Sequence, residues 1–260
     1  MRRAAPTFLL VILAALFGAT PAVAKTVCTL VADAATGALI HEQGTCDRRV
    51  TPASTFKVPI ALMGYDAGIL ANPHAPVWQF REGYPDWVAA WKQDTDPTGW
   101  MKESVLWYSQ EITRALGQER FAAYVAAFGY GNGHISGNKG KKDGLTRAWL
   151  SSSLKISPQE QVAFFRKFLA RALPVSDTAY RMTAAIMTAF PLANGWTVYG
   201  KTGSGRAGEK AIGWFVGWAT DGNRTVVFAR QADYPRSELM RAGRSTRDDV
   251  LKDLQAILTN

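Results

Sequence analysis

The sequence is poor in the side chains that bind transition metals. Its 260 residues include only three histidines, His41, His74 and His134, and two cysteines. Zinc sites combine several Cys, His or carboxylate ligands, and structural sites space them closely along the chain. Because the histidines lie far apart in the sequence, we expect no metal ion and exclude a zinc-dependent hydrolase.

A concentrated basic surface is also lacking. The 30 basic side chains outnumber the 21 acidic ones, but the only dense basic run is Lys-Gly-Lys-Lys at residues 139–142. Proteins that bind nucleic acid gather positive charge in a patch or stripe, whereas this glycine-flanked run is typical of a solvated loop. We therefore predict no nucleic-acid partner, although the surplus charge favours the approach of anionic small molecules.

Only one long apolar run occurs, at residues 8–17. Two arginines precede it and Ala22-Val23-Ala24 follows it, an order typical of a secretory signal peptide. A membrane-spanning helix would need ~20 apolar residues. We predict that residues 1–24 are cleaved and that the mature chain is periplasmic, without stable insertion in the membrane; an uncleaved anchor is the alternative.

The two cysteines, Cys28 and Cys46, both lie near the start of the predicted mature chain. Export to an oxidising compartment makes a disulfide between them plausible. Two buried free thiols are the alternative, and the sequence does not decide between them.

Strand patterns occur near both ends of the chain. Apolar segments flank turn-forming residues at positions 33–37, within residues 28–42, and at positions 221–223, within residues 211–231. Each pattern predicts a β-hairpin. Residues 245–258 carry apolar side chains at helical spacing and acids in the first turn, so a helix is predicted there.

The middle of the chain is mostly helical by periodicity. The predicted helices cover residues 104–116, 119–128, 158–172 and 177–188. Together the segments predict an α+β fold, in which an antiparallel sheet built from both chain ends is flanked by helices and carries an inserted all-helical lobe. The predicted sheet lobe comprises residues 25–58 and 190–260, the helical lobe residues 59–189, and the site lies at their junction.

The segment Thr51-Pro52-Ala53-Ser54-Thr55-Phe56-Lys57 is expected to begin a helix. Thr51 is predicted to cap it, and Pro52 suits its first position. Ser54 and Lys57 then share a face. A serine hydroxyl needs a neighbouring base to become a nucleophile, and a buried lysine with a lowered pKa can be that base. Taken alone, the Ser-x-x-Lys pattern is weak because chance produces it often.

A second candidate element is Lys201-Thr202-Gly203, on a predicted strand and followed by Ser204. Beside a serine nucleophile, Lys201 offers a charge and Thr202 a hydroxyl to a substrate carboxylate. The backbone amides of Ser54 and Ser204 are expected to form an oxyanion hole.

Ser-x-x-Lys at a helix start and a distant Lys-Thr-Gly on a strand form the paired signature of penicillin-recognising serine enzymes. Ser104-Val105-Leu106 and Tyr130-Gly131-Asn132 further resemble the class D, oxacillinase-type, serine β-lactamases. The resemblance covers nearly the whole predicted mature chain. It implies a hydrolase that opens β-lactam antibiotics through an acyl-enzyme on Ser54.

The same resemblance implies roles for further residues. Lys57 is expected to react with carbon dioxide and to act as general base in this carbamylated form, with no other cofactor. Trp149 matches the tryptophan whose indole steadies the carbamate, although core packing would also explain it. Ser104 matches the hydroxyl that passes a proton to the β-lactam nitrogen.

Substrate binding is less sharply located by the resemblance. Arg244 is the chosen partner for the substrate carboxylate, with Arg241 and Arg247 as alternatives. Tyr130, together with Asn132, is expected to line the pocket, and a structural role in a turn is the alternative.

Two rival functions share this chemistry. A penicillin-binding peptidase and a β-lactam-sensing receptor domain both acylate without rapid turnover. Trp149 and the class D motifs favour rapid turnover. Sensor domains of this kind are attached to several membrane-spanning helices, whereas the only long apolar run predicted here is the leader. Neither the preferred β-lactam nor the oligomeric state follows from the sequence.

Overall fold

The computed structural model describes Met1 and residues 24–259, so nearly all of the predicted leader lies outside the described residues. Within the described part of the chain, no helix combines the length and the apolar character that crossing a membrane requires.

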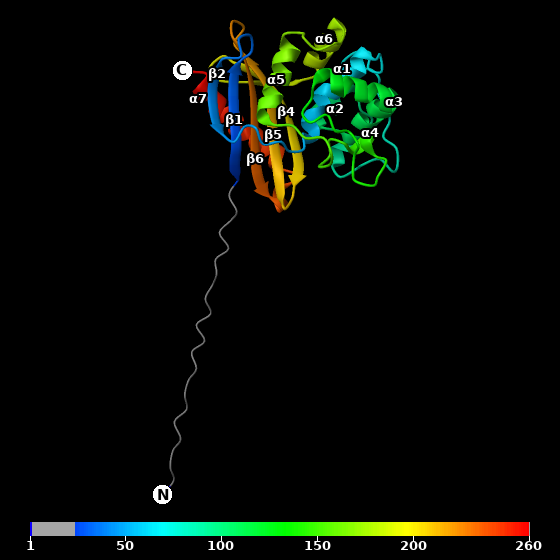
Figure 1. Ribbon diagram of the computed structural model, residues 1–260, viewed down its shortest axis with the longest axis horizontal. Coiled ribbons are helices and arrows are strands. Elements are labelled where there is room, and N and C mark those ends of the chain that lie inside the picture. Colours follow the sequence, from blue (N-terminus) through cyan, green and yellow to red (C-terminus); the bar gives the residue numbers. More distant parts are fainter. Residues whose placement is uncertain (2–23, 260) are drawn as a thin grey trace.

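A six-stranded antiparallel sheet forms one side of the molecule, and most of the helices lie beside it (Figure 1). Its strands run in the order β2-β1-β6-β5-β4-β3. Their bounds are β1 Lys25–Asp33, β2 Leu39–Gly44, β3 Thr188–Pro191, β4 Thr197–Ala207, β5 Lys210–Thr220 and β6 Thr225–Pro235. The N-terminal hairpin therefore pairs with the last strand, β6, and the predicted sheet built from both chain ends is confirmed.

Seven α-helices and three short 3-10 helices are present in the described residues. The α-helices are α1 Lys57–Asp66, α2 Pro97–Glu103, α3 Leu106–Phe128, α4 Gly144–Arg147, α5 Pro158–Leu169, α6 Asp177–Ala185 and α7 Ala242–Ile257. The 3-10 helices are η1 Ala53–Phe56, η2 Ala89–Trp91 and η3 Arg236–Glu238. The two helices predicted at residues 104–128 follow one another directly and meet at Gly117, whose φ of 75° and ψ of 166° interrupt the helix.

The two faces of the sheet are covered by different helices. Val31 and Phe228 on one face pack with Val250 and Leu254 of α7. Side chains alternate between the two faces along a strand, so Leu30, Val227 and Ala229, which are sequence neighbours of Val31 and Phe228, lie on the other face. There they join the main core with the aromatic side chains of α5.

The position of α5 differs from the predicted division into lobes. Residues 59–189 were predicted to form a helical lobe, but Phe165 and Phe168 of α5 lie 6.2 and 5.6 Å from the ring of Trp218 on β5. The apolar face of this helix therefore covers the sheet, whereas α1 to α4 lie beside it (Figure 1).

Cys28 on β1 and Cys46 beyond β2 are joined by a disulfide. The bond closes a segment with a sequence separation of 18 residues around the N-terminal hairpin. The alternative of two free thiols is thereby excluded in this structure.

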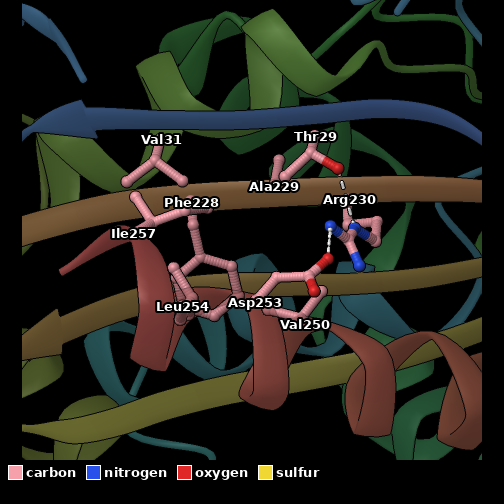
Figure 2. Close-up of a pocket in the computed structure, with 9 residues that line it drawn as sticks. All are labelled: Thr29, Val31, Phe228, Ala229, Arg230, Val250, Asp253, Leu254 and Ile257. Atoms are coloured by element: carbon pink, nitrogen blue, oxygen red, sulfur yellow. Dashed lines mark hydrogen bonds and ion pairs between the residues drawn. The ribbon is translucent and has the colours of Figure 1, made fainter. Parts of the chain in front are cut away.

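The interface between α7 and the sheet also contains a buried charge. Arg230 on β6 donates from Nε to Thr29 Oγ1 at 2.8 Å and forms an ion pair with Asp253 of α7 (Figure 2). The gap between these elements leaves no space for a water-sized molecule. It is a packed interface rather than a binding cavity.

Candidate active site

Ser54 lies in a strained turn at the junction of the sheet and the helices. It belongs to the 3-10 helix η1, which precedes α1 directly. Ala53, the residue before it, has a φ of 49°, in the left-handed region that is costly for a residue with a Cβ atom. Such strain persists only where neighbouring contacts hold it.

The predicted start of this helix needs two corrections. Thr51 does not cap it: Pro52 occupies the N-cap position, and no side-chain cap hydrogen bond is formed. The first turn is 3-10, and the α-helix begins only at Lys57. The Thr51 hydroxyl is used in tertiary contacts instead.

Lys57 is fully buried, and its Nζ atom lies 3.5 Å from Ser54 Oγ. Burial lowers the pKa of this amine well below its usual value, and the nearby Lys201 ammonium lowers it further. Removing an ammonium from water disfavours the charged form, so burial favours the neutral amine of Lys57. A neutral amine beside a serine hydroxyl can accept its proton.

Lys201 on β4 connects the strand to the turn between α2 and α3. Its Nζ atom donates to Ser104 Oγ at 2.5 Å and to the carbonyl oxygen of Thr202 at 3.0 Å. Burial lowers the pKa of Lys201 to about 7, and the charge of Glu103 opposes that shift. The Lys201–Ser104 pair can therefore hold or release a proton near neutral pH.

Strand β4 approaches the Ser54 turn through positions that have no side chain. A Cβ atom on Gly203 would lie 2.9 Å from the carbonyl oxygen of Pro52, and one on Gly205 would lie 2.6 Å from Thr51 Cγ2. Both distances are shorter than packed atoms tolerate, so these glycines permit the close approach. Ser54 and the Lys201–Ser204 segment therefore face one another.

Trp149 is tied to the same turn from the other side. Its carbonyl oxygen accepts hydrogen bonds from the Ala53 amide at 3.1 Å and from Thr51 Oγ1 at 2.7 Å. Its ring lies 5.6 Å from that of Phe56, the residue before Lys57. The indole Nε1 atom is buried and has no hydrogen-bond partner among the described residues. An orphaned buried donor at this place suits an acceptor bound beside Lys57.

Tyr130 lies beneath the site rather than in its wall. The side chain is 1% exposed, its ring packs 5.1 Å from that of Phe56, and its hydroxyl donates to Gln161 Oε1 at 3.4 Å. Asn132 holds the adjacent turn by donating to the Ser153 carbonyl at 2.9 Å. Because no surface of Tyr130 is open to a ligand, the structural alternative replaces the predicted contact with substrate.

The three candidate arginines differ in their surroundings. Arg247 forms an ion pair with Asp248 and lies over the ring of Phe190. Arg244 and Arg241 are exposed, and neither has an ion pair within the described residues. Gly243, between them, donates its amide to Ser204 Oγ at 2.9 Å. This places the start of α7 against β4 and favours Arg244 or Arg241 over Arg247 as the carboxylate partner.

One buried residue of the site was missed in the sequence. Gln161 on α5 is 1% exposed, and it donates from Nε2 to Thr55 Oγ1 at 2.9 Å while accepting from Tyr130. It connects Tyr130 to the residue after Ser54. The available signal was a polar side chain in register with Phe165 and Phe168 on the apolar stripe of the helix.

Comparison with known proteins gives a consistent assignment. The family model for the penicillin binding protein transpeptidase domain matches residues 27–256. Beta-lactamase OXA-9 of Klebsiella pneumoniae is 43% identical over 242 residues, which are 90% of this chain and 88% of that protein. The methicillin resistance mecR1 protein of Staphylococcus aureus is 29% identical over 84% of this chain but only 36% of its own length.

A solved structure agrees with these relatives. The OXA-427 class D β-lactamase superposes with a TM-score of 0.83 at 44% identity, covering 89% of this chain and 98% of that one. The penicillin-binding transpeptidase fold, the extent of the match and the arrangement of Ser54, Lys57, Ser104 and Lys201 point to one family. The chain is a member of the class D serine β-lactamases.

Proposed function

We propose that this protein hydrolyses β-lactam antibiotics through an acyl-enzyme on Ser54, with carbamylated Lys57 as general base. The observation that carries the proposal is the fully buried Lys57 amine 3.5 Å from Ser54 Oγ, where burial lowers the lysine pKa. In an apo site such a contact is long, and it is expected to shorten when substrate binds.

Acylation begins when Ser54 Oγ attacks the carbonyl carbon of the β-lactam ring and its proton passes to the base at Lys57. The amides of Ser54 and Ser204 are assigned to the oxyanion hole, a contribution of about 3 kcal/mol for each donor in comparable acyl transfers. As the carbon–nitrogen bond breaks, Ser104 delivers a proton to the leaving nitrogen and is reprotonated by Lys201, which donates to it at 2.5 Å. The proton taken up at Lys57 then passes to Lys201 through solvent, which restores both groups before deacylation.

The surroundings of Lys57 fit carbamylation. Carbon dioxide adds to a neutral lysine amine with loss of one proton, and the product supplies a carboxylate-like base for both acylation and deacylation. Lys57 meets the first requirement because burial lowers its pKa. The unpartnered indole Nε1 of Trp149 offers the donor that an added carboxylate-like group needs.

Recognition of the substrate carboxylate is assigned to Lys201, Thr202 and Arg244. Thr202 is partly exposed, and its hydroxyl lies 3.5 Å from Lys201 Nζ. Arg244 is exposed at the start of α7, where the helix meets β4. We further propose that the leader directs the mature enzyme to the periplasm, where these small-molecule substrates arrive.

Steady-state hydrolysis of a chromogenic cephalosporin tests the function. Wild type should turn over many equivalents, and Ser54→Ala should abolish both turnover and covalent attachment of the drug while keeping the wild-type melting temperature. A single stoichiometric burst from wild type would instead assign the chain to a trapping function, like that of a sensor or a slowly hydrolysing peptidase. Turnover that survives Ser54→Ala would remove Ser54 as the nucleophile.

A further inference from the structure

The Thr51 side chain joins two segments that are far apart in the sequence. It is 3% exposed, and its hydroxyl donates to the Trp149 carbonyl oxygen at 2.7 Å and accepts from the Ser151 amide at 2.9 Å. Its own carbonyl oxygen accepts from the indole Nε1 of Trp214 on β5 at 2.9 Å. The hydroxyl thus uses both its donor and its acceptor capacity on one short stretch around Trp149.

The segments joined by Thr51 are both strained. Ala53 and Ser151 have φ angles of 49° and 56°, left-handed values that are unfavourable for residues other than glycine. Ala53 comes two residues after Thr51, and Ser151 comes two residues after Trp149. The Trp149 carbonyl oxygen also accepts a hydrogen bond from the Ala53 amide at 3.1 Å. Conformations of this kind persist when surrounding contacts fix them, and Thr51 provides two of those contacts.

Strand β4 contacts both Thr51 and Ser151. Ser151 Oγ accepts from the Arg206 amide at 2.8 Å, and Gly205 lies against the Thr51 methyl group. The Thr51 hydroxyl therefore lies where the Ser54 turn, the Trp149 segment and the end of β4 meet.

We propose that Thr51 is a positioning residue that fixes Trp149 and thereby stabilises the carbamylated form of Lys57. The inference rests on the proposed function. Trp149 is held at its backbone by Thr51 and Ala53, while its indole Nε1 atom is buried and without a partner in the described residues. Loosening the backbone would shift the indole relative to Phe56, the residue before Lys57, whose ring it contacts. Ser54 follows Ala53 in the same turn, so turnover at saturating bicarbonate separates an effect on Ser54 from an effect on carbamylation.

Thr51→Val tests the proposal because it keeps the shape of the side chain and removes only the hydroxyl. Turnover of a chromogenic cephalosporin is measured against bicarbonate concentration in degassed buffer. The half-saturating bicarbonate concentration should rise by about tenfold, as expected for the loss of one or two buried hydrogen bonds, while turnover at saturating bicarbonate recovers. Thr51→Ser, which restores the hydroxyl, should return the half-saturating concentration to the wild-type value.

A second measurement does not depend on turnover. In protein exposed to carbon-13 bicarbonate, the carbamate signal in the nuclear magnetic resonance spectrum should require about tenfold more bicarbonate in Thr51→Val than in wild type. Thr51→Ala removes the same hydroxyl and leaves a smaller side chain, so it replaces Thr51→Val in both measurements if the valine variant does not fold. Equal bicarbonate dependence in wild type and in the folded variants would overturn the role of Thr51.

Two comparisons separate positioning from simple destabilisation. Thr246→Val removes another fully buried hydroxyl, which bonds to the Ala242 carbonyl and to Tyr234. It should lower the melting temperature without changing the bicarbonate response, and a response that follows melting temperature in both variants would overturn the proposal. In a Trp149→Phe background, Thr51→Val should have little further effect on that response because both changes act through the same indole.

The proposed function fails separately from this inference. If wild type itself shows neither a carbamate signal nor a bicarbonate response, carbamylated Lys57 is wrong and the premise for Thr51 is removed. If wild type shows both and Thr51→Val shows them unchanged, only the role of Thr51 is wrong.

Discussion

Two regions of the molecule differ in whether their buried charged groups have partners. On β6, Arg230 has Thr29 and Asp253 as partners, and the buried Asp233 is paired with Arg48 and Lys210. At the junction with the helices, Lys57 and Lys201 are buried and form no ion pair within the described residues. A paired charge stays ionised and holds elements together, whereas an unpaired buried amine loses affinity for its proton and becomes available for chemistry.

The largest expected effect comes from restoring a permanent charge at the junction. Lys57→Arg places a guanidinium, which stays protonated in proteins, where a neutral amine is needed. Hydrolysis should fall by about 10³-fold or more, the scale of a lost general base, with the fold intact by circular dichroism. Lys57→Ala serves as the uncharged comparison and should be similarly inactive. If Lys57→Arg retained near-wild-type turnover, the requirement for a neutral amine would be wrong.

A second expected effect is on the pH dependence of stability. Burial lowers the pKa of Lys201 to about 7 in the folded chain, below its ordinary value of 10.5. The unfolded chain therefore binds more protons between these pH values, so stability rises with pH across that window and is lost as pH falls towards 7. The slope that one such group adds is at most about 1.4 kcal/mol per pH unit.

Lys201→Met removes this group while keeping an apolar chain of similar length. Its melting temperature should exceed that of wild type at pH 7, and the gap should narrow as pH approaches 10. The same variant should lose most of its specificity constant for β-lactams, since the carboxylate loses a cationic partner. Parallel melting curves across the pH range would contradict an uncharged or easily discharged Lys201.

The smallest effects are expected from the paired region. Asp233→Asn leaves Arg48 and Lys210 without their carboxylate and should lower the free energy of unfolding by about 2 kcal/mol. This is less than for a fully buried ion pair because both cations are partly open to solvent. Asp253→Asn should cost less than about 1 kcal/mol, because Asp253 is half exposed. Urea unfolding measures both, and turnover should stay within about twofold of wild type. A large loss of turnover without a loss of stability would show that the two regions are coupled.

The sequence predicted the sheet and the central site residues because their signals are local. The hairpins follow from turn residues between apolar segments, and Ser54 and Lys57 share a face through their spacing along one turn. Lys201 was proposed from its place on a predicted strand and Ser104 by resemblance, and the structure brings Lys201 Nζ to 2.5 Å from Ser104 Oγ.

The errors concern side chains whose partners lie far away along the chain. Thr51 was predicted to cap a helix, but its hydroxyl bonds to residues 149 and 151. Tyr130 was expected in the pocket wall, yet it is buried against Phe56. No local pattern distinguishes a hydroxyl that caps its own helix from one that bonds to a distant loop, so such assignments need the tertiary structure.

The absence of side chains at positions 203 and 205 limits how this enzyme can change its substrate range. At both positions the main chain of β4 packs so tightly against Pro52 and Thr51 that even a methyl group has no room. A side chain at either position would have to separate β4 from the Ser54 turn. Changes in drug preference that keep the site intact are therefore expected at other positions.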